Sequence, residues 1–186
     1  MEISDETLVR QAVTLKDVSA FEQLVHRHQV RMLHLQRRFV RDHALAEDLA
    51  QETFLRAWDK LDTFRGTGSF AAWLTRLGYN IFLQHRRKMS NATKAEQPYP
   101  DDAEGDANAT TEAMATPGPH DELPDLPKLL AVLPEAEQLV LVLSYGQGLS
   151  VTEISDVLDV PSGTIKSQIH RAKEKIRAHF KIEAAA

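Results

Sequence analysis

The chain has 186 residues, 42% of them hydrophobic and 26% charged, with a formal net charge of −5. This length allows one ordinary domain or two small ones. The absence of cysteine excludes disulfides, thiolate metal sites and cysteine nucleophiles, and no apolar run approaches the length of a membrane span. The N-terminal stretch MEISDETLVRQ does not resemble a signal peptide, so we expect a cytoplasmic protein.

The first half of the chain predicts three helices. Ser19 and Glu22 have the spacing of a capping box, and apolar residues at helical spacing follow them. A second helix is predicted over residues 44–61 and a third over residues 70–88. The FRGTGS stretch between these two helices contains two glycines and predicts a loop.

The negative charge is concentrated in the middle of the chain. Residues 96–127 contain nine acids and no Lys or Arg, whereas residues 1–95 have a net charge of +4 and residues 128–186 a net charge of zero. The middle segment has few large apolar side chains and cannot offset the entropy of ordering, so we interpret it as a flexible acidic linker. The fold class predicted is all-α, with two small helical domains joined by this linker.

The C-terminal segment has the pattern of a helix-turn-helix. LPEAEQLVLVLSYGQG predicts a buried helix that ends at its glycines. Ser150 and Glu153 form a second capping box at the start of a short helix, and DVPS then breaks the chain before a basic helix. In such units the second helix enters the major groove of DNA and its N-terminal residues reach base edges.

The basic helix buries Ile165, Ile169 and Ala172 in this interpretation, which leaves cationic and polar residues outside. Lys, Arg and Ser can bind base edges or phosphates. The alternative is a surface helix whose lysines are simply solvated. The residues expected to contact duplex DNA are Thr164, Lys166, Ser167, Gln168, His170, Arg171 and Lys173.

The predicted helix over 44–61 has an apolar stripe that includes Trp58. A second candidate surface lies on the opposite side of this helix. This surface is acidic, amidic and partly apolar, a composition that favours a protein interface over open water. The alternative is a solvated face in which Glu52 and Arg56 form an ordinary i, i+4 pair. The residues that share the face by helical spacing are Asp48, Gln51, Glu52 and Leu55.

The predicted helix over 70–88 presents a third candidate surface. Its outward stripe combines cations and amides, with Tyr79 and Phe82 nearby, and such a surface suits single-stranded DNA, whose bases stack on aromatic rings. Trp73 is better explained as a core residue, because it lies on the apolar stripe. The stripe consists of Arg76, Asn80, Gln84 and Arg87.

Three stretches resemble one protein family. LPEAEQLVLVLSYGQGLSVTEISDVLDVPSGTIKSQIHRAKEKIR is similar to the C-terminal promoter-binding domain of bacterial sigma factors of the extracytoplasmic-function (ECF) group. AEDLAQETFLRAW and FRGTGSFAAWLTRLGYN are similar to the N-terminal domain of the same family. The chain departs from the usual pattern at Ser155, Gln168 and Lys173, and at Gln84, where the family has Asp.

The resemblance assigns a partner to each surface. The acidic face of residues 44–61 would dock on the clamp coiled coil of the largest subunit of RNA polymerase. The helix over 70–88 and the loop before it would hold the melted minus-ten element, with Phe64, Arg65 and the loop 66–69 around a flipped base. The C-terminal helix would bind the minus-thirty-five element as duplex. The connector between the domains would thread the polymerase cleft, where its acids would mimic nucleic-acid charge, and the alternative is a solubilising tether.

The resemblance implies an initiation factor for a stress or environmental regulon, with core RNA polymerase, promoter DNA and an anti-sigma factor as partners. We expect no catalysis, cofactor, metal or small-molecule substrate, since the chain has no HExxH, P-loop or GxGxxG motif. His28 is interpreted as a core histidine. Two alternatives are a sigma mimic, whose DNA faces should lack these cations, and a dimeric regulator, which would bind a palindrome.

Overall fold

The computed structural model describes residues 3–95 and 130–183, and within these ranges it is helical and contains no strand. The predicted linker over 96–127 therefore lies outside the described residues, and the domain boundaries remain predictions. The N-terminal helices are α1 (Asp5–Thr14), α2 (Val18–Phe39), α3 (His43–Asp59) and α4 (Phe70–Ala95), with a short 3₁₀ turn η1 (Leu61–Thr63) after α3. The C-terminal helices are α6 (Glu135–Leu141), η2 (Val142–Gly146), α7 (Val151–Leu158) and α8 (Ser162–Glu183). The prediction of an all-α fold is confirmed.

The helix starts follow from local hydrogen bonds. Asp17 caps α2 by accepting from Ser19 N and Ala20 N, so the predicted Ser19–Glu22 capping box is wrong. The second predicted capping box is present, because the side chains and backbone amides of Ser150 and Glu153 bond reciprocally at the start of α7. Helix α1 was not predicted from the sequence.

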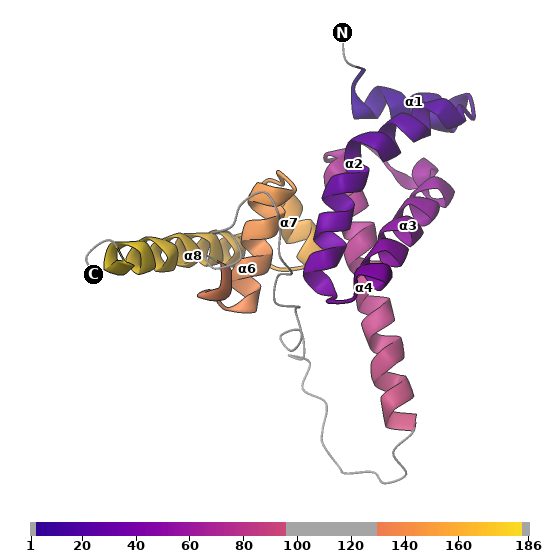
Figure 1. The fold of residues 1–186 in the computed structure, drawn as a ribbon. Coiled ribbons are helices and arrows are strands. Elements are labelled where there is room, and N and C mark those ends of the chain that lie inside the picture. The colour runs from indigo at the N-terminus through magenta and orange to yellow at the C-terminus, as the bar shows by residue number, and fades with distance from the viewer. Residues whose placement is uncertain (1–2, 96–129, 184–186) are drawn as a thin grey trace.

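Helices α2, α3 and α4 form the N-terminal core (Figure 1). Close approach of α2 and α4 depends on Gly78, since a Cβ there would lie 2.8 Å from Met32 Sδ and 3.0 Å from Gln36 Nε2. Gln36 is fully buried and donates to Gly78 O at 3.1 Å, which ties the two helices together. Helix α1 docks on α2, where Asp5 Oδ2 lies 2.7 Å from Nε2 of the buried His28. The interpretation of His28 as a core histidine is confirmed.

The C-terminal helices form the predicted helix-turn-helix. Ile154 of α7 and Ile165 of α8 are completely buried against each other's helices, and Ala172 continues the inner face of α8. Asp159 adopts a left-handed conformation with φ of 57° and ends α7. This residue turns the chain sharply enough for α8 to start at Ser162.

The two groups of helices pack together. Helix α7 contacts α4, and buried residues of both groups belong to one continuous hydrophobic cluster. Gln147, which is buried, donates from Nε2 to the backbone carbonyl of Arg31 on α2 at 3.0 Å. Helix α8 points away from α2 and α4, so one side of it remains open (Figure 1).

Candidate functional site

The loop before α4 lines a pocket of about 190 Å³. Phe64 and Arg65, which the resemblance places around a flipped base, line it together with Arg76 from the predicted outward stripe, and Arg65 and Arg76 are exposed. Trp73 also lines the pocket and is only partly buried, 5.8 Å from the ring of Phe64 between centroids. The prediction that Trp73 is a core residue is therefore only partly correct, because Trp73 also exposes part of its ring to the pocket. Cations beside two aromatic rings can hold phosphates and a splayed base.

The remaining residues of the α4 stripe lie outside this pocket. Asn80, Gln84 and Arg87 are exposed farther along the same helix. Tyr79 and Phe82, expected beside them, are buried, and Phe82 stacks on Phe39 at 4.6 Å between centroids. The prediction that these two rings could stack on DNA bases is wrong. Both rings lie in the core, because exposing their apolar surface to water would cost free energy.

The exposed face of α3 borders an apolar groove of about 640 Å³ between α2 and α3, which we call the α2–α3 groove. Gln51 and Leu55 line it, and Leu55 is 69% exposed. Val30 and Trp58 also line it and are exposed, so the placement of Trp58 on the buried stripe is wrong. A groove with unburied large apolar side chains and a polar rim has the anatomy of a protein interface.

The two acidic members of the α3 face lie outside the lining of the groove. Asp48 is exposed, and Glu52 Oε1 lies 2.7 Å from Arg56 Nη2, so the i, i+4 pair named in the alternative interpretation of this face does form. Arg56 Nη1 also donates to Gln84 Oε1 at 2.8 Å. Arg56 therefore connects the acidic face of α3 with the stripe on α4, a link that helical spacing within either segment cannot reveal.

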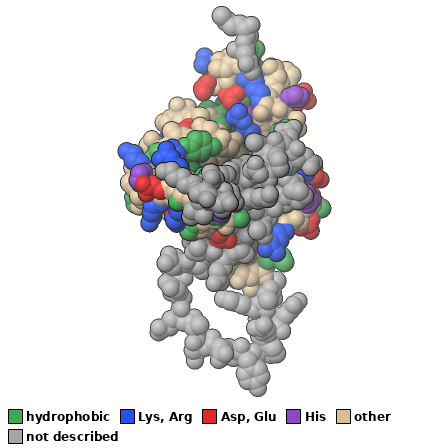
Figure 2. All heavy atoms as spheres, turned by 60° about the vertical axis from the view of Figure 1, so that its left-hand side comes forward, with side chains coloured by type: hydrophobic (Ala, Val, Ile, Leu, Met, Phe, Trp, Pro, Cys, Tyr) green, Lys and Arg blue, Asp and Glu red, His purple; other side chains and the backbone are tan. Residues whose placement is uncertain are grey.

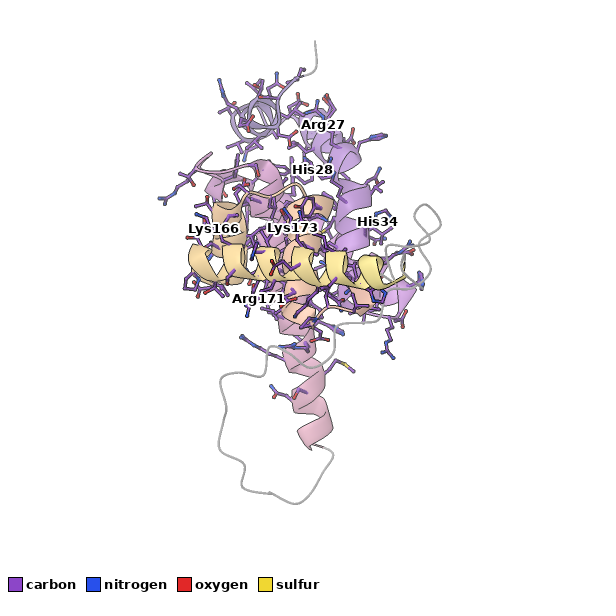
Figure 3. The ribbon with its side chains drawn as sticks, turned by 90° about the vertical axis from the view of Figure 1, so that its left-hand side faces the viewer. Arg27, His28, His34, Lys166, Arg171 and Lys173 are labelled. Atoms are coloured by element: carbon purple, nitrogen blue, oxygen red, sulfur yellow. The ribbon has the colours of Figure 1, made fainter. Side chains whose placement is uncertain are left out.

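The residues of α8 that were predicted to contact DNA form a face of the helix. This face has polar side chains along its middle and cationic side chains along its two edges. Lys166 and Lys173 lie on one side of the helix and Arg171 on the other (Figure 3). The helical spacing places Ser167 and His170 between these edges. Both are exposed, as is Thr164, while Gln168 is half-buried. Glu174 Oε1 lies 3.5 Å from His170 Nε2 and adds a negative charge between the two cationic edges.

The edges of α8 make contacts with neighbouring helices. Lys173 Nζ lies 5.4 Å from the ring centroid of Tyr145, an exposed residue that the sequence interpretation missed. On the opposite edge, Lys175 Nζ donates to Glu137 Oε1 at 2.9 Å, and Arg171 Nε lies 3.9 Å from the same oxygen. Figure 2 shows the resulting mixed surface, with Lys and Arg side chains gathered at its left edge around acidic and His side chains.

Glu153 joins the pocket to the helix-turn-helix. Its Oε1 accepts from Ser69 N at 3.0 Å and from the Ser69 hydroxyl, and its Oε2 accepts from Ser150 N and Ser150 Oγ, each at 2.8 Å. Ser69 Oγ also accepts from Ala72 N at 3.1 Å and so caps α4. One carboxylate therefore organises the first turns of both α4 and α7.

The pKa of Glu153 predicts how stability depends on pH. Burial alone raises this pKa, but the hydrogen bonds from Ser69 and Ser150 outweigh it and lower the pKa from 4.5 to about 2. Because the folded pKa lies below the unfolded one, Glu153 stabilises the fold above pH 4.5, and this stabilisation is lost as the pH falls towards about 2. We expect the wild type to exceed Glu153→Gln in the free energy of urea unfolding at about pH 5, and to lose part of that advantage at about pH 3. An advantage that stays constant over this range contradicts the prediction.

Comparison with known proteins agrees with this geometry. The family model described as Sigma-70 region 2 matches residues 24–91, and that of Sigma-70, region 4 matches residues 124–176. The RNA polymerase sigma-H factor of Pseudomonas aeruginosa is 35% identical over 181 residues, which cover 92% of this chain and 91% of the relative. The ECF RNA polymerase sigma-E factor of Escherichia coli strain K12 is 32% identical over 184 residues, which cover 94% of this chain and 93% of the relative.

A solved structure shares the fold over nearly the whole chain. The structure of CnrH in complex with the cytosolic domain of CnrY has a TM-score of 0.64 and 26% sequence identity, covering 96% of this chain and 97% of that one. The matches to Sigma-70 region 2 and region 4, in this order along the chain, place the protein in the class of transcription initiation subunits. The chain belongs to the ECF group of RNA polymerase sigma factors.

Membership of this family establishes the activity. The protein is a promoter-specific transcription initiation factor and has no catalysis of its own. Among the described residues, no helix has both the length and the apolar character needed to cross a membrane.

Proposed function

We propose that the three surfaces of this chain divide the work of promoter recognition. The acidic face of α3 and the α2–α3 groove bind the clamp coiled coil of core RNA polymerase. The loop 64–69 and the outer stripe of α4 hold the melted minus-ten strand, and α8 reads the minus-thirty-five element as duplex. Residues 1–95 and 128–186 act as separate domains in this proposal, with 96–127 as the linker.

The observation that carries the proposal is the exposure of Leu55 beside the α2–α3 groove. Leu55 is 69% exposed, and Val30 and Trp58 are also exposed around the groove. Binding of a partner over these side chains would remove their apolar surface from water, which favours the complex. Gln51 on its rim supplies hydrogen-bonding capacity, and Asp48 adds negative charge nearby. The cationic loop and α8 surfaces lie elsewhere, so protein and DNA need not compete for one site.

An anti-sigma factor is the regulatory partner we propose. CnrH was solved in complex with the cytosolic domain of CnrY, and a second fold relative, the sigma factor RpoE of Bartonella quintana, was solved with the anti-sigma factor NepR. That second structure has a TM-score of 0.63 and 23% identity and supports the fold alone. We place the chain in the cytoplasm, associated with the nucleoid when bound to polymerase, in the service of a stress or environmental regulon.

Run-off transcription tests the proposal directly. Purified core polymerase is supplied with a pool of genomic promoter fragments, with and without this protein. We expect new transcripts whose start sites share two spaced, unlike upstream elements. Start sites that share a palindrome instead favour a dimeric regulator. If core polymerase does not bind the protein, the sigma mimic becomes the better reading, and an anti-sigma pull-down tests it.

Arg171 provides a sharper test of the α8 assignment. Arg171→Ala is expected to weaken binding to the minus-thirty-five duplex by roughly tenfold, since a lost contact of this kind costs about 1–3 kcal/mol. Core polymerase binding should not change. Lys175→Ala is the control, because Lys175 lies one turn farther along the same edge and donates to Glu137 at 2.9 Å, whereas Arg171 Nε lies 3.9 Å from that carboxylate. Fluorescence anisotropy with labelled duplex measures the difference, and loss of core binding in Arg171→Ala would show that the residue is structural.

A further inference from the structure

Helix α7 covers part of the minus-ten pocket, by which we mean the pocket lined by Phe64, Arg65 and the start of α4. Three residues of α7 line the same pocket, namely Glu153, Asp156 and Val157. Glu153 reaches the backbone amide and the hydroxyl of Ser69, the last residue of the loop. A segment distant in sequence therefore supplies one wall of the site proposed for single-stranded DNA.

The wall that α7 supplies is negatively charged, as is the DNA strand that the pocket is proposed to hold. Arg65 and Arg76 line the pocket from the loop and α4, and Glu153 and Asp156 line it from α7. A DNA strand brings phosphates to such cations and accepts hydrogen bonds from backbone amides. The carboxylate of Glu153 already accepts the amide hydrogen of Ser69, so a strand that used this amide would have to displace the carboxylate that α7 supplies.

The packing of the two domains contains both favourable and unfavourable contributions. Buried apolar residues and the bond from Gln147 to Arg31 O favour it. Arg38 opposes it, because this side chain is only 5% exposed and its Nε and Nη1 have no hydrogen-bond partner among the described residues. Burial lowers the pKa of the Arg38 guanidinium, and the negative charge of Glu135 on α6 acts in the opposite direction. A buried cation with unsatisfied donors costs stability that opening would recover.

The minus-thirty-five surface is not covered in the same way. Lys166, Ser167, His170 and Lys173 are all exposed on α8, which projects from the rest of the molecule (Figures 1 and 3). The described arrangement thus leaves one proposed DNA surface open while α7 obstructs the other.

We propose that α7 acts as an internal competitor of the minus-ten strand, and that the free protein is closed through the Glu153–Ser69 contact until its domains separate. The proposal deepens the proposed function, because it rests on the assignment of the pocket to the minus-ten strand. Closure reduces the apparent affinity for the strand in proportion to the fraction of molecules that are open. Binding of polymerase to α3, on another surface of the N-terminal domain, leaves room for α7 to leave the pocket.

A distance measurement in the free protein tests the closure. Because the chain has no cysteine, Glu22→Cys on α2 and Ala178→Cys on α8 provide two unique, exposed sites for spin labels. We expect one short, narrow distance distribution in the otherwise unchanged protein. Ser69→Asp should broaden it and shift it to longer distances, since Asp can still cap α4 but repels Glu153. Ser90→Asp, the same change at an exposed position farther along α4, should leave it unaltered.

A second variant removes the contact from the other side. Glu153→Ala loses both bonds to Ser69, while Ser150 still caps α7 through its hydroxyl. We expect it to lengthen the distance as Ser69→Asp does, and circular dichroism checks that each variant keeps its helices. If either variant retains its helices and also keeps the distance of the parent protein, the proposed closure is wrong.

Strand binding separates the closure from the assignment of the pocket. The probe is a fluorescein-labelled pool of random single-stranded 12-mers, measured by anisotropy on unlabelled proteins. If about a tenth of the protein is open, Glu153→Ala should bind roughly tenfold more tightly, and Glu6→Ala, which also removes one exposed acid, should not. Addition of Arg76→Ala should reverse the gain. A longer distance without tighter binding overturns the competitor role and locates the failure in the minus-ten assignment, whereas an unchanged distance overturns the closure itself.

Discussion

Asp48→Arg combined with Glu52→Arg is expected to abolish detectable binding to core RNA polymerase while the domain remains folded. Both residues lie on the outer face of α3, beside the groove that exposes Leu55. Truncation of a single interface hot spot commonly costs about 2 kcal/mol or more, so two charge reversals should weaken binding by well over about 30-fold. The cost to folding is small, because the new Arg at 52 meets Arg56 as a like-charge i, i+4 pair worth only about 0.2–0.5 kcal/mol.

The measurement is co-purification with core enzyme, supported by circular dichroism and a thermal midpoint for each variant. Glu22→Arg is the matched control, since it reverses one exposed acid on α2 that lines neither the groove nor the acidic face. We expect the control to co-purify as the wild type does. Undiminished co-purification of the double variant would show that polymerase binds another surface.

Features determined by neighbouring residues were predictable from the sequence. The Ser150–Glu153 capping box, the turn before α8 and the inner face of Ile165 and Ala172 are all present in the structure. Each depends on residues within a few positions of one another, where spacing determines which groups can meet. The same local reasoning failed at α2, because Asp17 stands two residues earlier and accepts hydrogen bonds from the amides of Ser19 and Ala20, so the helix has already begun before Ser19.

Features that depend on long-range packing were not predictable from one sequence. Glu153 was identified as a capping residue, but its second set of bonds goes to Ser69, 84 residues away. Tyr79 was placed near an exposed stripe, yet it is buried against Phe39. Trp58 shows the reverse error, since it was placed on the buried stripe but lines the α2–α3 groove and is 37% exposed. Helical periodicity gives the face of a helix but not the partner that covers it.

Arg56 illustrates how two surfaces become connected through such packing. Its guanidinium bonds Glu52 on the face proposed for polymerase and Gln84 on the stripe proposed for the minus-ten strand. Gln84 stands where the family has Asp, and an amide oxygen still accepts the bond from Arg56. Because these groups are substantially exposed, the connection contributes little to stability and matters mainly for the orientation of the side chains.

Phe70→Ala is expected to lower the free energy of unfolding by about 3–5 kcal/mol, more than any other substitution proposed above. Phe70 is 1% exposed and begins α4 directly after the loop. Its ring lies 5.3 Å from His28, 5.8 Å from Phe64 and 5.5 Å from Trp73 between centroids. The substitution leaves a cavity among these rings, and domains of this kind have only about 5–15 kcal/mol in total. Urea unfolding measures the loss, and Phe70→Leu, which keeps much of the volume, should retain most of the stability.

The same substitution separates support of the pocket from binding of polymerase. Phe64 and Trp73 form the aromatic wall of the minus-ten pocket, and both rest on Phe70. At a temperature where Phe70→Ala is still folded, we expect minus-ten strand binding to fall while co-purification with core polymerase persists through the α2–α3 groove. An unchanged free energy of unfolding would mean that Phe70 is not packed as described. Equal loss of strand binding and polymerase binding would instead mean that the two surfaces depend on one cooperative core.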